Sequence, residues 1–345
     1  MDVAGERASG RHTQGRNAPM NLDLRRRAML GGLLMSGISV RGAAAGAVNR
    51  PVRIVNGFPP GGSSDTVARL YAEHMRGLYA PQIIVDNRSG AGGRLALEQV
   101  KAAEPDGTTI VHTPAGQLTI FPHIYTTLRY DPATDFIPVT TLVTYASTFV
   151  VAANHPARDL IEFGDWVRRE GGEVSFGTPG AGTSTHFLGL QIGNALGIRM
   201  QHVPYRGISP ALQDLLAGQI PCATAAVGEV RELQRAGQLR MLGISTPERL
   251  PSLPEVKTYA EQGFAGLTFQ ESFGLLLPAR TPAGHVQQLY DAVRVAAEKP
   301  ALRETLARLE YGIVNLAPAD YAASLQADRD RWGPVIRATG FKAED

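Results

Sequence analysis

Two segments of this sequence place glycines and hydroxyl side chains directly before a helix-patterned run. The first is "FPPGGSSDTVARLYAEHM" at Phe58–Met75, and the second is "SFGTPGAGTSTHFLGLQIG" at residues 175–193. The first N–H groups of a helix lack intrahelical partners, and the helix macrodipole adds partial positive charge there. Such an end binds carboxylate or phosphate without a cationic side chain. Because no lysine follows the glycines, as a nucleotide-binding P-loop requires, we predict that the first segment holds the carboxylate end of a small organic acid.

If the two segments face one cleft, they form a two-sided clamp for an anion. Their candidate binding residues are Pro60, Gly61, Gly62, Ser63, Thr178, Gly180, Gly182, Thr183, Ser184 and Thr185. Asp65 is expected to cap or orient the first loop, since its charge would repel a bound anion. For either segment taken alone, a capped structural turn is the alternative, because any turn into a helix favours Gly, Ser and Asp.

A third segment, "HVPYRGISPALQDLLAGQI" at residues 202–220, adds Tyr205 and Arg206. Both side chains could reach the cleft, Arg206 as an anion partner. The alternatives are a packed tyrosine and a surface arginine. Ser209 followed by Pro210 predicts a helix N-cap with proline at the first helical position.

The sequence lacks the GxSxG, HExxH and Walker A patterns of common enzyme sites. Its eight histidines show no metal-ligand spacing, so neither a metal nor another cofactor is predicted. His186 follows the hydroxyls of the second segment, and an exported enzyme that uses His186 or Glu271 is the alternative from another class. Cys222, the only cysteine, is predicted to be a buried core residue.

The first 47 residues have the features of an export signal. Three arginines at 25–27 precede the apolar run Ala28–Val40, which is followed by "RGAAAGA". These are the n-region, h-region and small-residue cleavage site of such a signal. The paired arginines resemble a twin-arginine signal. Cleavage is predicted after Ala45 or Ala47, and Met20 is an alternative start.

Charge outside this region is balanced. Residues 1–47 hold seven arginines against three acids, and the rest of the chain carries 27 basic and 29 acidic side chains. There is no basic excess to bind nucleic acid or an anionic membrane. We therefore expect a free periplasmic protein.

Strand-like and helix-like segments alternate after residue 50, which indicates parallel α/β structure. Helices are predicted at Thr66–Leu78, Leu160–Glu170, Thr185–Leu196 and Pro210–Leu216. Two long strand-like segments, near residues 150 and 270, bound a central αβ block. We therefore predict two αβ domains between which the chain crosses twice, with domain 1 at residues 48–150 and 270–345 and domain 2 at residues 151–269.

Seven collinear segments resemble the Bug-type periplasmic substrate-binding proteins of tripartite tricarboxylate transporters. They are "FPPGGSSDTVAR", "VDNRSGAGG", "EPDGTTIV", "FGTPGAGTSTH", "HVPYRGISPALQDLLAGQI", "LRMLGIST" with "RLPSLPEV", and "LLLPARTP". The resemblance runs from about Arg50 to the C-terminus. It implies a type II periplasmic-binding-protein fold, with two αβ domains closing on a small carboxylated ligand. The family's carboxylate-binding elements match Pro60–Ser63 and Thr178–Thr185.

The implied function is a solute receptor that captures a di- or tricarboxylate or an acidic amino acid by hinge closure and delivers it to membrane transporter subunits. We expect a monomer. A ligand-sensing receptor for a signalling partner is the alternative within the same fold. The sequence departs from the family where Pro221-Cys222 follow "LLAGQI" and where Gln270-Glu271 stand in place of a frequent aromatic residue. Near the cleft, Glu271 would favour a ligand with an amino group over a tricarboxylate.

Overall fold

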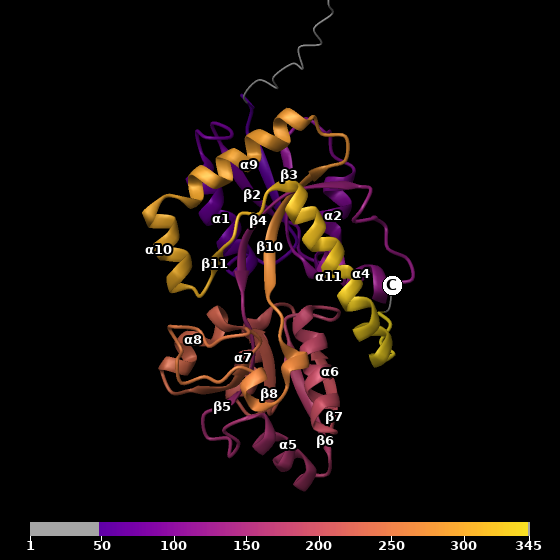
Figure 1. Cartoon of the computed structure of the whole chain (residues 1–345), viewed down its shortest axis with the longest axis vertical. Helices are drawn as coiled ribbons and strands as arrows, with labels where there is room; N and C mark the ends of the chain where they lie inside the picture. Colours follow the sequence, from indigo (N-terminus) through magenta and orange to yellow (C-terminus); the bar gives the residue numbers. More distant parts are fainter. Residues whose placement is uncertain (1–47, 344–345) are drawn as a thin grey trace, which may run out of the picture. The chain divides into compact units, whose positions relative to one another are not determined.

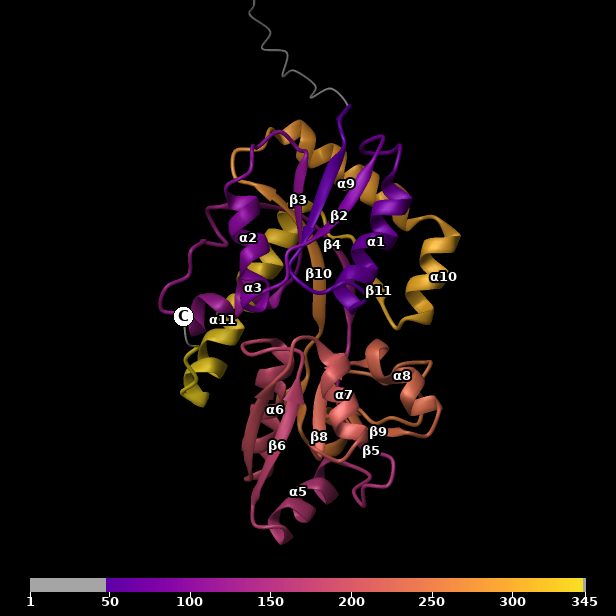
Figure 2. The same ribbon diagram turned by 180° about the vertical axis from the view of Figure 1, so that it is seen from behind.

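Residues 48–343 are described by the structure, which is a computed structural model. The described residues form two α/β lobes, which Figures 1 and 2 show from opposite sides. Among them, every helix is too short or too polar to span a lipid bilayer. The export signal predicted for residues 1–47 lies outside the described residues.

The first lobe is built on a six-stranded mixed sheet with the strand order β11-β4-β10-β3-β1-β2. Its strands are β1 (Val52–Asn56), β2 (Ile83–Asn87), β3 (Thr109–Pro114), β4 (Phe136–Tyr145), β10 (Glu271–Pro278) and β11 (Gly312–Ile313). β1 pairs in parallel with β2 and β3, whereas β10 is antiparallel to β3 and β4. Val52, Ile54 and Val55 of β1 are fully buried, as expected for a parallel strand with both faces covered.

The second lobe is built on a five-stranded sheet with the order β7-β6-β8-β5-β9. Its strands are β5 (Ser147–Ala152), β6 (Glu173–Thr178), β7 (Arg199–Pro204), β8 (Cys222–Ala226) and β9 (Leu239–Ile244). β6 is parallel to β7 and β8, and β5 is antiparallel to β8 and β9. Cys222 is fully buried, which confirms its predicted place in the core.

The chain passes between the lobes twice. The first passage joins β4 to β5 through a single residue, Ala146, and the second leads from β9 to β10. Since β10 re-enters the first sheet at the end where β4 leaves it, the two strands run in opposite directions. The parallel pairing that the alternation indicates is found between β1 and its neighbours β2 and β3 and between β6 and its neighbours β7 and β8, whereas the crossing strands pair antiparallel. The two-domain fold with two crossings is confirmed, and the domain boundaries drawn at residues 150 and 270 stay a prediction.

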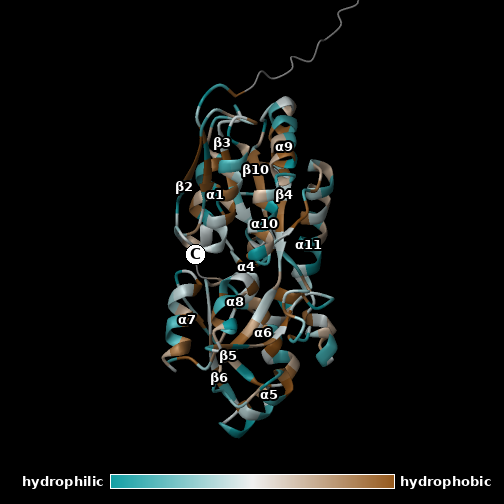
Figure 3. Ribbon diagram, turned by 90° about the vertical axis from the view of Figure 1, so that its left-hand side faces the viewer, coloured by the Kyte–Doolittle hydropathy of each residue, from teal (hydrophilic) through white to brown (hydrophobic). Residues whose placement is uncertain are grey.

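Helices cover the sheets, and their apolar faces supply the core. The helices are α1 (Ser63–Met75), α2 (Arg94–Lys101), α3 (Gly116–Thr119), α4 (Phe121–Ile124), α5 (Leu160–Arg169), α6 (Ser184–Leu196), α7 (Ile208–Leu216), α8 (Val227–Arg235), α9 (Ala283–Ala297), α10 (Pro300–Arg308) and α11 (Pro318–Thr339), with 3-10 turns η1 (Ala91–Gly93), η2 (Ala260–Gln262) and η3 (Ala265–Leu267). In α1, Val67, Tyr71 and Met75 recur every four residues and are fully buried, as one face of a helix requires. Figure 3 shows hydrophobic ribbon in central strands such as β10 and β4.

Two helix starts differ from the sequence prediction. α1 begins at Ser63, three residues earlier than predicted, with Gly62 as its N-cap. α7 begins at Ile208 after the N-cap Gly207, so the prediction of Ser209 as N-cap is wrong. Gly207 has a φ of +87°, which glycine adopts at little cost. The helix begins at the next residue, Ile208, whose side chain is buried.

The long C-terminal helix α11 packs against both lobes. Tyr321 and Leu325 in its first half join the core cluster of Val111 and Leu276 in the first sheet. Further along, the Trp332 ring lies 6.1 Å from the ring of Phe187 on α6. Figure 1 shows this helix, in yellow, running from the first sheet towards α6.

Candidate functional site

A cavity of about 610 Å³ lies where the loop and first turn of α1 meet the first turn of α6. Its walls also include the start of α7 and residues of β4, α8 and β10. Both crossing strands and both hydroxyl-bearing helix starts therefore contribute to one space.

Eight of the twelve predicted site residues line this cavity. They are Pro60, Gly61, Gly62, Ser63, Thr183, Ser184, Thr185 and Glu271. Thr178, Gly180, Gly182 and Tyr205 are not part of its wall. The structure thus brings the two predicted segments together, while their contact with a ligand stays a prediction.

Thr178 and Tyr205 are held by protein partners instead. The Thr178 hydroxyl donates to the carbonyl of Gly180 at 3.0 Å and lies 2.6 Å from Nε2 of His202. The Tyr205 hydroxyl donates to the Asp214 carboxylate at 2.7 Å. The Tyr205 side chain is therefore packed within its own lobe, as the alternative to a cleft position predicted.

Gly182 acts through its backbone. It is buried, with a φ of +74°, and a Cβ atom built there would lie 2.5 Å from Cδ1 of Ile124 on α4. A side chain at this position would therefore push the α6 loop away from the first lobe.

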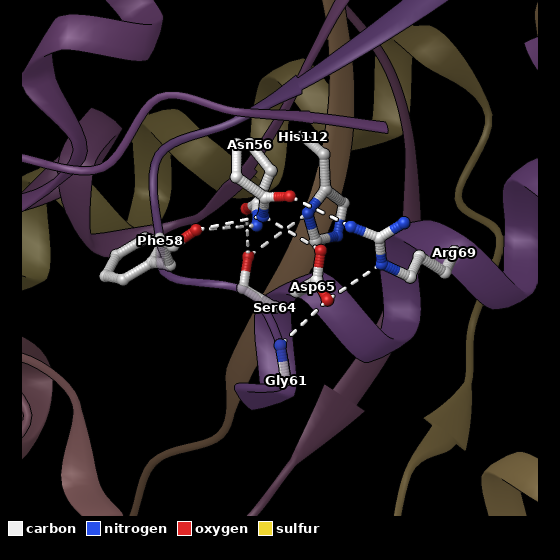
Figure 4. Close-up of polar contacts among 8 residues, drawn as sticks. Asn56, Phe58, Gly61, Ser64, Asp65, Arg69 and His112 are labelled. Carbon is white, nitrogen blue, oxygen red and sulfur yellow. Dashed lines mark hydrogen bonds and ion pairs between the residues drawn. The ribbon is translucent and has the colours of Figure 1, made fainter. Parts of the chain in front are cut away.

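The loop before α1 is fixed by the buried carboxylate of Asp65. Its Oδ2 accepts hydrogen bonds from the Gly61 N–H and from Arg69 Nε, each at 2.9 Å, and its Oδ1 accepts one from Asn87 at 2.8 Å. Burial alone would raise the pKa of Asp65, but these partners hold it below its usual value. The prediction that Asp65 orients the loop is confirmed; Figure 4 shows this network.

A second polar chain anchors the same turn beneath the cavity. Ser64 Oγ donates to Asn56 Oδ1 at 2.6 Å and lies 3.2 Å from His112 Nδ1. Since the serine proton points at Asn56, His112 must donate from Nδ1, which places its proton on that nitrogen. Burial lowers the pKa of His112 to about 3, so the ring is neutral (Figure 4).

The start of α6 is organised in a similar way. Thr183 is the N-cap, and its Oγ accepts from the His186 N–H at 3.2 Å. His186 Nδ1 accepts from the Gly182 N–H, and its ring stacks on that of His202 with centroids 3.7 Å apart. Burial, and then the neighbouring His202, lower the pKa of His186 to about 3. His186 is absent from the cavity wall, which places it in the packing of this turn.

Two glutamates line the cavity, and sequence reasoning found only one of them. Glu271 is the first residue of β10, and Glu229 lies in the first turn of α8. The Glu271 carboxyl accepts a hydrogen bond from the Ser184 side chain. Glu229 accepts from the hydroxyl and the backbone N–H of Ser63. Each carboxyl thus contacts the first residue of a helix in the other lobe.

Burial raises the pKa of both carboxyls. That of Glu271 reaches about 7, and the hydrogen bond from Ser184 only partly offsets the burial. For Glu229 burial again outweighs the hydrogen bonds from Ser63 and Ala226. Burial of a carboxylate favours its neutral form in this way.

Several other wall residues were not predicted as binding residues. They are Gln117, Phe121, Tyr145, Glu229 and Phe273, among others. Arg206 is exposed, as its surface alternative predicted, yet it also borders the cavity. No local pattern marks Glu229 or Tyr145, because their place in the wall depends on the chain crossings.

Among residues 48–343, no group of three or more His, Cys, Asp or Glu side chains is arranged to hold a metal ion.

Two α/β lobes that share crossing strands and enclose a cavity between opposed helix starts define the class of two-lobed solute-binding proteins. The sequence matches the family described as "Tripartite tricarboxylate transporter family receptor" over residues 67–341. The chain belongs to this family, which confirms the predicted Bug-type receptor resemblance.

Relatives match along almost the whole chain. A protein of Pseudomonas sp. strain P51, described as "UPF0065 protein in tcbD-tcbE intergenic region", is 34% identical over 90% of this chain and 94% of its own length. Protein BugT of Bordetella pertussis is 26% identical over 85% of this chain and 90% of its own.

Solved structures have the same fold as this chain. The periplasmic binding protein BugD is 28% identical, with a TM-score of 0.79 over 86% of this chain and 99% of its own. MatC of Rhodopseudomonas palustris with bound malate is 30% identical, with a TM-score of 0.78 over 83% of this chain and 99% of its own. Rpa4515 of R. palustris with adipate is 28% identical, with a TM-score of 0.80 over 85% of this chain and 98% of its own.

Proposed function

We propose that this protein is a periplasmic receptor that captures a small carboxylate in the cavity between its lobes. Lobe closure around the ligand is the mechanism, and membrane subunits of a tripartite tricarboxylate-type transporter are the partner. The observation on which the proposal rests is the shared cavity lined by Ser63 of α1 and Ser184 of α6.

The chemistry of the walls supports a carboxylate. Helix starts attract anions through unpaired N–H groups and the macrodipole, and Arg206 adds one cationic side chain at the border. The malate and adipate bound by structural neighbours are both carboxylates. A ligand that contacts both helix starts binds the closed arrangement better than an open one, and this difference in affinity is what drives closure.

We infer that the protein acts as a monomer in the periplasm, after removal of the signal proposed at residues 1–47. Binding rather than turnover is its expected activity, because His186 is buried and is not part of the cavity wall. Cell fractionation and size-exclusion chromatography with light scattering test the location and the monomeric state.

The main test is identification of the bound solute. The protein is purified under native conditions and denatured, and the released small molecules are measured by mass spectrometry. A thermal-shift panel of C4–C6 acids follows, since a ligand that binds only the folded state raises the melting temperature. We expect a released carboxylate, and saturable binding of at least one acid in calorimetry. A protein that binds no carboxylate by either method is not the receptor proposed here.

A further inference from the structure

Glu271 has one carboxylate oxygen that the protein leaves without a partner. The residue is 4% exposed, lines the cavity and accepts a hydrogen bond from Ser184. Its Oε2 is buried and has no hydrogen-bond partner among the described residues. Leaving a buried polar atom unpaired is costly, so such an atom in a binding cavity indicates a donor that arrives with the ligand.

The groups around Glu271 do not neutralise it. Tyr145 stands opposite it in the β4–β10 pairing, and the Ser184 side chain of α6 donates to its carboxyl. From α11, Asp328 and Arg331 act on its pKa in opposite directions. No ion pair of Glu271 occurs among residues 48–343.

The charges of the cavity wall favour a ligand that carries a cation. Glu229 and Glu271 are both part of the wall, whereas Arg206 is the one Arg or Lys among its described residues. A dicarboxylate would add two negative charges beside two carboxyls. A ligand with a carboxylate and an ammonium group adds no net charge and brings N–H donors of the kind a carboxylate oxygen accepts.

The aromatic part of the wall is compatible with an ammonium group. Phe273 lies two residues after Glu271 on β10 and therefore on the same face of the strand. Its ring stacks on that of Tyr145 at 4.8 Å between centroids, and both residues line the cavity. Aromatic faces attract cations through the ring quadrupole.

We propose that Glu271 forms an ammonium subsite, so that the ligand is an amino carboxylate whose protonated amino group donates to Oε2. This inference rests on the proposed receptor function and specifies its ligand class. The carboxylate end of the ligand faces Arg206, which borders the same cavity. Binding fixes Glu271 in its ionised form, so a proton leaves the carboxyl when the ammonium arrives.

The test uses acids that differ only in the amino group. Calorimetry compares aspartate with succinate, glutamate with glutarate, and phenylalanine with 3-phenylpropanoate. In every pair that binds, the amino member is expected to bind at least about tenfold more tightly, the factor of one charge-assisted hydrogen bond. Calorimetric titrations of the protein with the ligand at pH 7.5, in buffers of different ionisation enthalpy, are expected to show that binding releases protons. At pH 8.5 fewer protons should be released, because less of the Glu271 carboxyl is protonated before binding.

Variants then assign the effect to Glu271. Glu271→Gln keeps the shape and removes the negative charge, so the preference for the amino member and the proton release should both disappear. The exposed Glu304→Gln on α10 is the matched control and should leave both unchanged. Circular dichroism and the melting temperature establish that each variant is folded.

The outcomes separate the two proposals. If the acids without an amino group bind equally well or better, or if binding takes up a proton, the ammonium subsite is wrong and the carboxylate receptor stands. If Glu271→Gln is folded and keeps the amino preference, Glu271 is not the subsite. If no acid of the panel binds and none is released from the purified protein, both proposals fall.

Discussion

At the scale of single residues, each lobe presents a glutamate to the first residue of a helix in the other lobe. Glu229 accepts hydrogen bonds from Ser63, and Glu271 accepts one from Ser184. Both serines were predicted as anion-binding residues. In this structure their side chains donate to protein carboxyls at the border of the cavity, so they position acidic side chains of its wall.

The Ser184 hydroxyl is therefore expected to matter more for affinity than the charge of Arg206. Ser184→Ala removes a hydrogen bond to a charged group, which costs roughly 1.5–3 kcal/mol, or about ten- to a hundredfold in affinity. Arg206→Ala removes an exposed side chain, whose charge is screened by water. Calorimetry with the tightest ligand measures both variants. Loss of all binding in Arg206→Ala, with Ser184→Ala unaffected, would reverse the ranking.

The stacked histidines predict a loss of stability in acid. Burial lowers the pKa of His202 to about 4 and that of His186 to about 3, below the unfolded value of about 6.5. Between these values the unfolded chain binds more protons than the folded one, so stability falls as the pH decreases. For each histidine the loss between pH 7 and pH 5 is about 2 kcal/mol.

His202→Gln tests this coupling. Glutamine keeps an N–H donor for Thr178 and removes one titrating group, so the decrease in unfolding free energy between pH 7 and pH 5 should shrink by about 2 kcal/mol. Chemical denaturation at the two pH values measures it. An unchanged decrease in the folded variant would mean that the pair does not set the acid sensitivity.

At the scale of elements, α8 lies unusually close to the connection between α10 and β11. A Cβ atom built on Gly228 would stand 2.2 Å from the carbonyl oxygen of Leu309. Only glycine permits this approach without a backbone shift. Because Glu229 follows directly, the same contact sets the position of one cavity carboxyl.

Gly228→Ala is expected to separate α8 from Leu309 and weaken ligand binding by about tenfold, the effect of losing one well-placed hydrogen bond. Gly266→Ala is the control, because a Cβ atom there meets no heavy atom within 4 Å. Calorimetry and small-angle scattering measure affinity and lobe separation. Wild-type affinity in Gly228→Ala would show that this contact does not shape the cavity.

At the scale of the whole molecule, an ion pair links the lobes beside that contact. Arg231 of α8 pairs with Glu310, and both side chains are less than one tenth exposed. Arg231 Nη1 also donates to the carbonyl of Arg308 at 2.6 Å, and Ser252 Oγ donates to Glu310 at 2.5 Å. These hydrogen bonds partly offset the desolvation of the buried pair, while Nε of Arg231 has no hydrogen-bond partner among the described residues.

Glu310→Gln leaves Arg231 buried without its counter-charge. We expect a loss of about 3 kcal/mol in the free energy of unfolding and faster ligand release. Asp165→Asn, in the exposed pair with Arg168, should cost less than about 1 kcal/mol. Denaturant unfolding and stopped-flow release measure both quantities. Equal losses in the two variants would mean that the Arg231–Glu310 pair does not stabilise the lobe contact.

The sequence by itself determined the two helix starts with their glycines and hydroxyls, the alternation of strands and helices, and the two crossings. These features are local, because an unpaired helix N–H or an apolar period depends on residues within a few positions. Pro60–Ser63 and Thr183–Thr185 accordingly line the cavity as predicted.

Only the tertiary structure decided which other side chains border that cavity. Glu229 and Tyr145 line the cavity because segments far apart in the sequence meet at the crossings. Thr178 and Tyr205 are not part of the wall, because their hydroxyls bond to His202 and Asp214 instead. Non-local pairing also set the direction of β10. Contacts between residues a hundred positions apart leave no local pattern, so the acidic character of the cavity became visible only once the chain was folded.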